Sequence, residues 1–226
     1  MPKAEPRRRS RMRVLVTAGP TRERIDPVRF LSNDSSGRMG FAIAEAARRA
    51  GHDVVLIAGP VTLATPKGVR RIDVESARDM LAAAKKEWRS ADALFMAAAV
   101  ADWRPAKQLA GKWRAKDGGA KSARLDLVRN PDVIATLTGG ERDPDRVVVA
   151  FALETGAGER RALAKLAEKG ADWIVLNGPV ALNADTTALV VLGADGVRIA
   201  IPKRTKAAAA RDLVALLRHR DDFRLG

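Results

Sequence analysis

Short runs of apolar residues alternate with amphipathic stretches along most of the chain. The runs are rich in Val, Leu, Ile and Ala, which is typical of parallel strands that are covered on both faces. They predict strands at 13–17, 53–58, 69–74, 93–100, 146–153 and 173–176. Two later runs, 188–192 and 197–201, flank a turn that contains Asp195-Gly196 and predict a β-hairpin.

Between these runs, apolar residues recur at the spacing of a helix that is buried on one face. The spacing predicts helices at 37–50 and 158–170, a helix after the capping box at 76–79, and a terminal helix at 205–219. Asn130-Pro131-Asp132 predicts the start of a shorter helix. Alternating strands and helices predict an α/β fold, with a mostly parallel sheet, helices on both faces and the antiparallel hairpin at one edge.

The pattern breaks first at residues 17–40, which join the first strand to the first helix. Such connections usually take about two to six residues. This one ends in Asn33-Asp34-Ser35-Ser36-Gly37, whose N–H groups and hydroxyls suit a bound anion, whereas capping a helix needs only one such residue. We predict an anion-binding loop here, because open α/β sheets bind ligands at the carboxyl ends of their strands.

The pattern breaks again at residues 101–128, which lack an apolar period and carry many lysines, arginines and glycines. A loop of this length in a compact domain is usually functional or disordered. We expect a protruding segment that returns to the body through a short strand at 124–128. No linker or internal repeat divides the rest, so 13–226 is expected to be one domain behind a disordered basic arm at 1–12.

Composition removes several kinds of chemistry. The 226 residues include no Cys, which excludes disulfides, a Cys nucleophile and Cys-containing metal sites. The two histidines, His52 and His219, are expected at the surface, so a Ser–His–acid triad is disfavoured. No apolar run is long enough for a membrane span and no secretory signal follows the basic start. We expect a cytoplasmic protein with no membrane partner.

The formal net charge of +14 raises the question of a nucleic-acid partner. Residues 1–13 hold six basic residues against one acidic residue, and the remaining excess is spread along the chain without aromatic interleaving. A basic surface also attracts small polyanionic substrates. We therefore favour a small anion over a specific nucleic acid, and keep a basic nucleic-acid-binding module as an alternative.

The phosphate-binding motifs of common nucleotide folds are missing. Gly19 is followed by Pro20 and Thr21, so the loop lacks G-x-G-x-x-G, and G-x-x-x-x-G-K-[ST] does not occur. A nicotinamide-dependent oxidoreductase with another loop stays open as an alternative. Asp102 follows the buried strand at 93–100, where an acid can meet a metal–nucleotide complex or a ribose, or can cap a turn.

The remaining candidates are basic. Lys165 and Lys169 lie four apart and could reach one polyphosphate, although spacing alone favours a solvated helix face. Lys112 could close over phosphates or be a surface lysine, and Phe151 by its place in a buried run is expected in the core. Lysines, arginines and one acid suit phosphate chemistry, in which positioning and charge neutralisation dominate.

Six motifs in one order carry a family likeness: 17–44, 97–106, Lys112, 128–134, 149–155 and 169–177. From Met12 onward the chain resembles phosphopantothenoylcysteine synthetase, the phosphopantothenate–cysteine ligase, of the bacterial CTP-dependent type. The resemblance implies a Rossmann-like domain that forms a homodimer, with a flap at about 102–127. It also implies that the carboxylate of 4′-phosphopantothenate attacks CTP, releasing pyrophosphate, and that L-cysteine then displaces CMP from the acyl-cytidylate.

The resemblance also assigns roles to residues. Asn33 matches the asparagine that handles the acyl-cytidylate, Arg29 an arginine important to the reaction, and Lys112 the flap lysine. Asp102 matches the acid that contacts CTP or its metal, Mg²⁺ or Mn²⁺. The remaining nucleotide contacts are expected at Met96, Ala97, Ala98, Pro131, Asp132, Val133, Ile134, Phe151, Lys165 and Lys169.

Three departures from the family pattern stand out. The flap often reads Lys-x-Lys-Lys, but here it reads Lys112-Trp113-Arg114-Ala115. Asn177-Gly178 stands where the family has Asn-Asp. The flavin-dependent decarboxylase that often precedes this domain is missing, so we expect a stand-alone synthetase or one half of a fused protein, binding no flavin. The preference for CTP over ATP rests on the resemblance alone.

Overall fold

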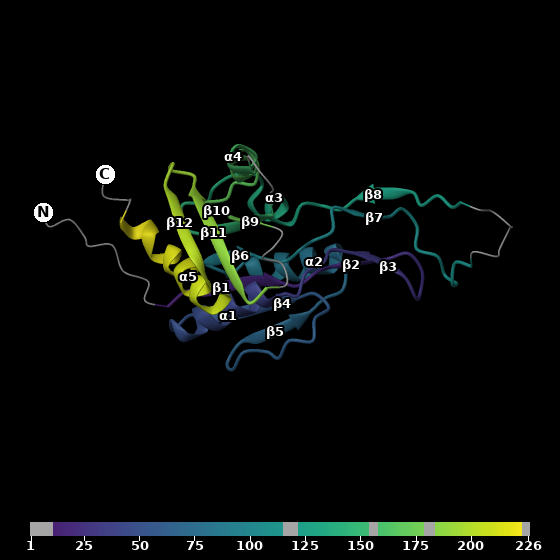
Figure 1. The fold of residues 1–226 in the computed structure, drawn as a ribbon, viewed down its shortest axis with the longest axis horizontal. Coiled ribbons are helices and arrows are strands. Elements are labelled where there is room, and N and C mark those ends of the chain that lie inside the picture. The colour runs from purple at the N-terminus through teal and green to yellow at the C-terminus, as the bar shows by residue number, and fades with distance from the viewer. Residues whose placement is uncertain (1–10, 115–121, 154–157, 179–183, 223–226) are drawn as a thin grey trace, which may run out of the picture.

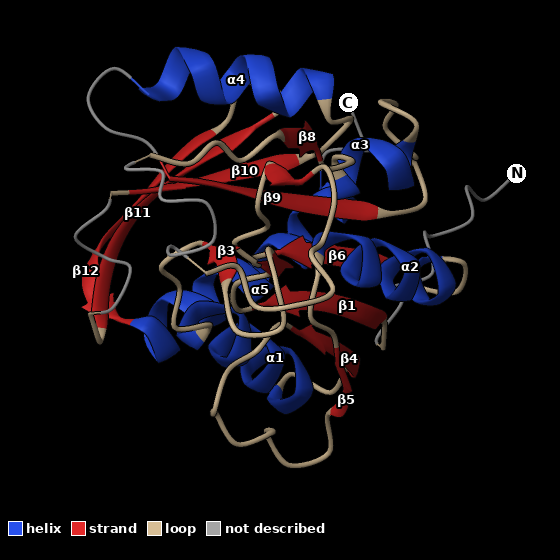
Figure 2. Cartoon of the chain, turned by 90° about the vertical axis from the view of Figure 1, so that its right-hand side faces the viewer, coloured by secondary structure: helices blue, strands red, loops and turns tan. Residues whose placement is uncertain are grey.

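The computed structural model describes residues 11–114, 122–153, 158–178 and 184–222, with side chains to Arg218. Its centre is an eight-stranded sheet in the order β12-β11-β10-β9-β6-β1-β4-β5 (Figures 1 and 2). Residues 1–10 of the basic N-terminal segment predicted at 1–12, the flap residues 115–121 and the side chain of His219 lie outside the described residues.

The predicted α/β architecture is confirmed. Neighbouring strands from β10 to β5 pair in parallel, whereas β11 and β12 form the predicted antiparallel hairpin against β10. The sheet strands are β1 (Arg13–Ala18), β4 (Asp53–Ala58), β5 (Arg70–Asp73), β6 (Ala93–Met96), β9 (Val147–Leu153), β10 (Trp173–Asn177), β11 (Thr186–Gly193) and β12 (Arg198–Thr205).

Helices cover both faces of the sheet (Figure 2). One face packs against α1 (Arg38–Arg49) and α5 (Lys206–Asp222), and the other against α2 (Ala77–Trp88), α3 (Val133–Thr138) and α4 (Gly158–Glu168). Successive side chains of a strand point to opposite faces of the sheet, so the core has two halves. Val14 and Val16 pack on the face covered by α1 and α5, whereas Leu15 packs on the face covered by α2, α3 and α4.

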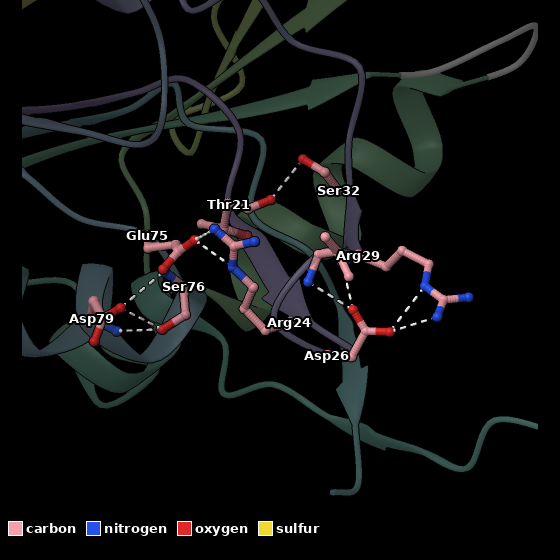
Figure 3. A network of polar contacts seen from close by, with 9 residues as sticks. Thr21, Arg24, Asp26, Arg29, Ser32, Glu75, Ser76 and Asp79 are labelled. Carbon is pink, nitrogen blue, oxygen red and sulfur yellow. Dashed lines mark hydrogen bonds and ion pairs between the residues drawn. The ribbon is translucent and has the colours of Figure 1, made fainter. Parts of the chain in front are cut away.

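Local chemistry fixes where two of these helices begin. Ser76 and Asp79 form the predicted capping box, with reciprocal bonds of 3.1 and 3.0 Å between side chains and backbone N–H groups (Figure 3). In the first turn of α1, Gly40 lies against β1, and a Cβ there would come within 2.5 Å of the Cβ of Ala18. A glycine is therefore required for the start of α1 to pack this closely on the first strand.

Two small antiparallel ribbons project from the body (Figure 1). One is the hairpin of β2 (Arg22–Arg24) and β3 (Phe30–Ser32), and the other pairs β7 (Trp103–Pro105) with β8 (Leu127–Arg129). We call these two ribbons, with the described residues between β7 and β8, the arm. The protruding segment was predicted, but the β2–β3 hairpin within 17–40 was not.

Other expectations are corrected. β6 ends at Met96 rather than at residue 100, because the N–H of Ala98 donates to the Thr17 hydroxyl (3.2 Å) and leaves the regular ladder. His52 is 7% exposed rather than on the surface, and its Nδ1 accepts the N–H of Met12 at 3.2 Å. Burial, together with the charge of Arg218, lowers the pKa of His52. None of the helices among the described residues has the length and apolar character needed to cross a membrane.

Candidate active site

A cavity of about 720 Å³ opens at the carboxyl ends of β1, β6 and β9. After β1 the chain adds β4 and β5 on one side, and then crosses to place β6 on the other side of β1. This reversal of strand order is a topological switch point, the position at which open α/β sheets bind ligands. The loops after β1 and β6 form much of the wall.

Most of the predicted site residues line this one cavity. They are Asn33, Met96, Ala97, Ala98, Asp102, Pro131, Asp132, Val133, Ile134, Phe151, Lys165 and Lys169. Phe151 is half-buried near the end of β9 and lines the cavity. Its position in an apolar run had predicted a fully buried core residue. Arg29 and Lys112 are not among the lining residues.

Asn33 connects the two loops of the switch point. Its side-chain amide donates to the carbonyls of Ala99 and Val100, each at 3.1 Å. The loop after β6 is further fixed by threonines, since the N–H of Ala101 donates to the Thr21 hydroxyl at 3.0 Å. Asn33 is exposed, so a ligand in the cavity can reach the side chain that joins these loops.

The α3–α4 end of the cavity carries an ion pair between Lys169 and Asp132. Asp132 also caps α3, because its carboxylate accepts the N–H of Ala135 at 3.0 Å. Burial acts to raise the pKa of Asp132, but the hydrogen bond from Lys169 and the helix N–H groups outweigh it and lower that pKa. Lys165 in α4 lines the same cavity as Lys169, which directly follows α4, so the structure brings the two lysines together.

Asp102 fits a metal that arrives with a nucleotide better than a metal held by protein alone. Its side chain is exposed at the cavity wall. The described residues contain no cluster of three or more His, Cys, Asp or Glu that could enclose a metal ion. Mg²⁺ commonly uses one or two carboxylates together with substrate phosphates and water, and one exposed carboxylate beside an anion site satisfies that requirement.

Arg29 lies instead in a network at the turn of the β2–β3 hairpin (Figure 3). Its partner Asp26 is fully buried and accepts N–H bonds from Val28 and Arg29, each at 2.8 Å, and from Trp113 at 3.0 Å. Burial acts to raise the pKa of Asp26, but these N–H groups and the Arg29 guanidinium lower it to about 2. Arg29 also stacks over the Trp113 ring, 5.8 Å from its centre.

This network decides where Lys112 lies. The N–H of Leu109 donates to the carbonyl of Ile25 at 2.8 Å, and the N–H of Trp113 donates to the Asp26 carboxylate. The chain is therefore bonded to the β2–β3 hairpin both before and after Lys112. Lys112 is exposed there. Lys112 therefore lies in a segment that is bound to the hairpin of Arg29, and neither residue lines the cavity of its own chain.

Sequence reasoning missed three cations in the cavity wall: Arg38 at the start of α1, Arg129 at the end of β8 and Lys206 at the start of α5. Lys206 is 8% exposed. Burial and the charge of Arg38 lower the pKa of Lys206, and Asp185 opposes this change. Arg38 and Lys206 stand at helix starts far apart in the sequence, where periodicity gives no sign of a shared cavity.

Residues 10–220 match a protein family described as "DNA/pantothenate metabolism flavoprotein C-terminal domain". The chain belongs to this family. The resemblance drawn from its motifs is thereby confirmed. Among curated relatives of this family domain, the "Coenzyme A biosynthesis bifunctional protein CoaBC" of Vibrio cholerae is 41% identical over 213 residues, which cover 91% of this chain and 52% of that protein. The Bacillus subtilis protein of the same name is 42% identical over 198 residues, or 85% and 48%.

The family domain spans about half the length of these curated relatives. The crystal structure of the C-terminal domain of a CoaBC protein superposes with a TM-score of 0.78 at 38% identity and covers 92% of this chain and 94% of that one. A structure named "Cab2 mutant H337A complex with phosphopantothenate-cysteine" has a TM-score of 0.73, at 16% identity over 93% and 86% of the two chains. The second comparison shows a shared fold.

Proposed function

We propose that this protein is a CTP-dependent phosphopantothenate–cysteine ligase of coenzyme A biosynthesis. Membership of the family and similarity to one half of the CoaBC proteins support the pathway. The observation that carries the reaction is the cavity at the switch point, which is lined by Asn33, Asp102 and the pair Lys165–Lys169. Such a set suits the binding of a polyphosphate.

The chemistry explains why a nucleotide is needed. A carboxylate is a poor acyl donor, because its oxygen is a poor leaving group. In the proposed first step, a carboxylate oxygen of 4′-phosphopantothenate bonds to the α-phosphorus of CTP, and the bond to the β-phosphate oxygen breaks with release of pyrophosphate. In the second step the amine of L-cysteine attacks the acyl carbon, CMP leaves, and the amide forms with loss of a proton.

The residues of the chain act in this scheme by positioning and charge. Lys165 and Lys169 hold the nucleotide at the α3–α4 end of the cavity, which Phe151 lines from the α1–α5 face of the sheet. Asn33 presents the acyl group at the junction of the two switch-point loops, where its amide is already fixed. Preorganised donors of this kind need no rearrangement when charge develops, which is the main source of catalysis in phosphate transfer.

Mg²⁺ or Mn²⁺ bound with CTP would neutralise phosphate charge, and the Asp102 carboxylate is the residue proposed to hold it. The side chain lies on the wall from which it can reach a phosphate-bound ion. The proposal includes no flavin, and the small molecules handled are CTP, 4′-phosphopantothenate and L-cysteine.

We also propose a homodimer that is formed through the arm. Large apolar side chains on the arm are exposed, including Val28 (57%), Trp103 (49%) and Leu127 (42%). Exposed apolar residues in such a cluster mark an interaction surface. Since Asp26 and Arg29 hold the segment with Lys112 outside its own cavity, this lysine is proposed to act at the cavity of the partner subunit.

The test is a matrix of reactions with one component omitted at a time. We expect pyrophosphate only when 4′-phosphopantothenate, CTP and Mg²⁺ are present, and CMP and the amide product only when L-cysteine is also added. Asn33→Ala should impair amide formation. If the complete mixture gives neither CMP nor pyrophosphate, or if NAD(P) but not CTP raises the melting temperature, the proposed function is wrong.

A further inference from the structure

Two asparagines hold the loop that follows β6. Asn33 binds the first two carbonyls of the segment 99–102, as described above. The next two carbonyls accept from Asn130, whose side-chain amide donates to Ala101 and whose backbone N–H donates to Asp102, each at 2.8 Å. Four consecutive carbonyls of this loop are therefore bound by two residues that both line the cavity.

The partners of the Asn130 side chain fix the orientation of its amide. Its Oδ1 accepts from the guanidinium of Arg104 at 3.1 Å, and its Nδ2 donates to the carbonyl of Ala101. A guanidinium only donates and a carbonyl only accepts, so turning the amide over would lose both bonds. An aspartate would lack the donor, and an apolar side chain would lack both groups.

The carboxylate of Asp102 depends on this loop for its position. It is exposed at the cavity wall, and in the part of the chain that the structure describes no hydrogen bond or ion pair reaches it. Its place is therefore set by the backbone at Ala101 and Asp102. Asn130 binds that backbone through two carbonyls, and the hydroxyl of Thr21 accepts the N–H of Ala101 on the other side.

Asn130 also connects this loop to the α3–α4 end of the cavity. The bond from its N–H to Asp102 continues the pairing of β7 with β8 by one residue. Two residues further along the chain, Asp132 caps α3 and pairs with Lys169. One residue thus joins the backbone of the proposed metal ligand to the end of the cavity that carries the lysines.

We propose that Asn130 is a positioning residue, which holds the Asp102 carboxylate where it meets a divalent ion bound to the nucleotide phosphates. This inference rests on the proposed function and deepens it, because it assigns the residue that aligns the proposed metal ligand. Asn130 acts on the ion through the backbone of the loop. Groups that bind and orient a metal ligand from behind commonly set the affinity of the site.

Titration calorimetry of the full chain with CTP, once with Mg²⁺ and once without a divalent ion, tests this role. Asn130→Leu leaves the net charge unchanged but can neither donate nor accept. We expect its Kd for CTP with Mg²⁺ to rise about three- to tenfold, as for one lost hydrogen bond, and its Kd without metal to change less than about twofold. A residue that only stabilises the fold would affect both values alike.

Two further proteins make the result specific. When Asp102 is already replaced in Asp102→Asn, adding Asn130→Leu should raise the Kd for CTP with Mg²⁺ by less than about twofold, because the ligand that it positions is gone. Ser76→Ala removes the cap of α2 outside the cavity and is the matched control for lost stability. Its Kd values should equal those of the wild type.

The outcomes separate this inference from the proposed function. If the wild type forms the amide, but Asn130→Leu changes both Kd values equally, changes neither, or adds its full effect to that of Asp102→Asn, the positioning role is wrong and the ligase proposal stands. If Asp102→Asn binds CTP with Mg²⁺ like the wild type, the positioning role fails together with the metal role of Asp102.

A wild type that neither binds CTP nor releases pyrophosphate from the complete mixture overturns both proposals. Should Asn130→Leu not fold, Asn130→Ala replaces it in the same measurements. The same loss with Mg²⁺, without loss in its absence, is then expected, and equal losses under the two conditions would contradict the inference.

Discussion

Replacing Lys169 by Met should weaken nucleotide binding by an amount that can be worked from its surroundings. The side chain is 23% exposed and is paired with Asp132, at the α3–α4 end of the cavity. A charge about 4–5 Å from a phosphate is worth roughly 2–4 kcal/mol at an effective dielectric constant of about 20–40. Partial exposure and salt reduce this to about 1–2 kcal/mol, which raises the Kd for CTP roughly five- to thirtyfold.

The substitution has a second effect, because it removes the ion pair of Lys169 with Asp132 and leaves that carboxylate at the cavity. That carboxylate then repels the phosphates, so adding Asp132→Asn should recover part of the lost affinity. Asn caps a helix as well as Asp, so α3 should still begin at the same residue. Because a half-exposed ion pair contributes about 0–1 kcal/mol to stability, the melting temperature should fall by no more than about 2–4 °C.

Calorimetry on the four proteins of this double-mutant cycle measures the coupling between the two residues. The affinities for CMP and for CTP should both fall in Lys169→Met. Lys203→Met, at an exposed position of β12 outside the cavity, controls for the loss of one positive charge. A Kd for CTP in Lys169→Met equal to that of the wild type would refute the reasoning and return Lys169 to a solvated helix face.

Three further results are expected. Gly40→Ala should lower the free energy of unfolding by about 1–3 kcal/mol in a denaturant titration, because its Cβ would meet Ala18 at 2.5 Å; an unchanged midpoint would contradict this packing. Asp26 has a lowered pKa of about 2, so its stabilising effect is present above pH 4 and lost toward pH 2; the stability difference between wild type and Asp26→Asn should shrink over that range, and a constant difference would speak against the network. Mixing Lys112→Ala with Asn33→Ala should restore activity if Lys112 serves the partner subunit, and no recovery after subunit exchange would place it in its own cavity.

The parts of the fold that could be predicted are those with long apolar patterns. Strand β9 has four consecutive buried residues, and the β11–β12 hairpin carries an Asp195-Gly196 turn between two apolar runs, so both could be recognised from the sequence. The ribbons of the arm could not be predicted in the same way, because strands of three residues are too short to show alternation. His52 sits in a turn by sequence, but it is buried in the structure, where its Nδ1 accepts the N–H of Met12.

The same limit applies to the site. The loop with Asn33 and the strand end before Asp102 could be placed at one sheet edge, because parallel strands end at the same edge. Lys206 could not, because it reaches the cavity only when the hairpin returns α5 to pack beside α1. The roles of Phe151 and the lysine pair came from family resemblance, since spacing alone favoured a core residue and a solvated face.

The central claim is that a carboxylate is activated by transfer of a nucleotidyl group. Its most direct test uses 4′-phosphopantothenate with ¹⁸O in the carboxylate, together with CTP, Mg²⁺ and L-cysteine, and mass analysis of the products. Attack on the α-phosphorus leaves one labelled oxygen in CMP and none in pyrophosphate. Label in inorganic phosphate with formation of CDP, or amide formation with unlabelled CMP, would contradict the account.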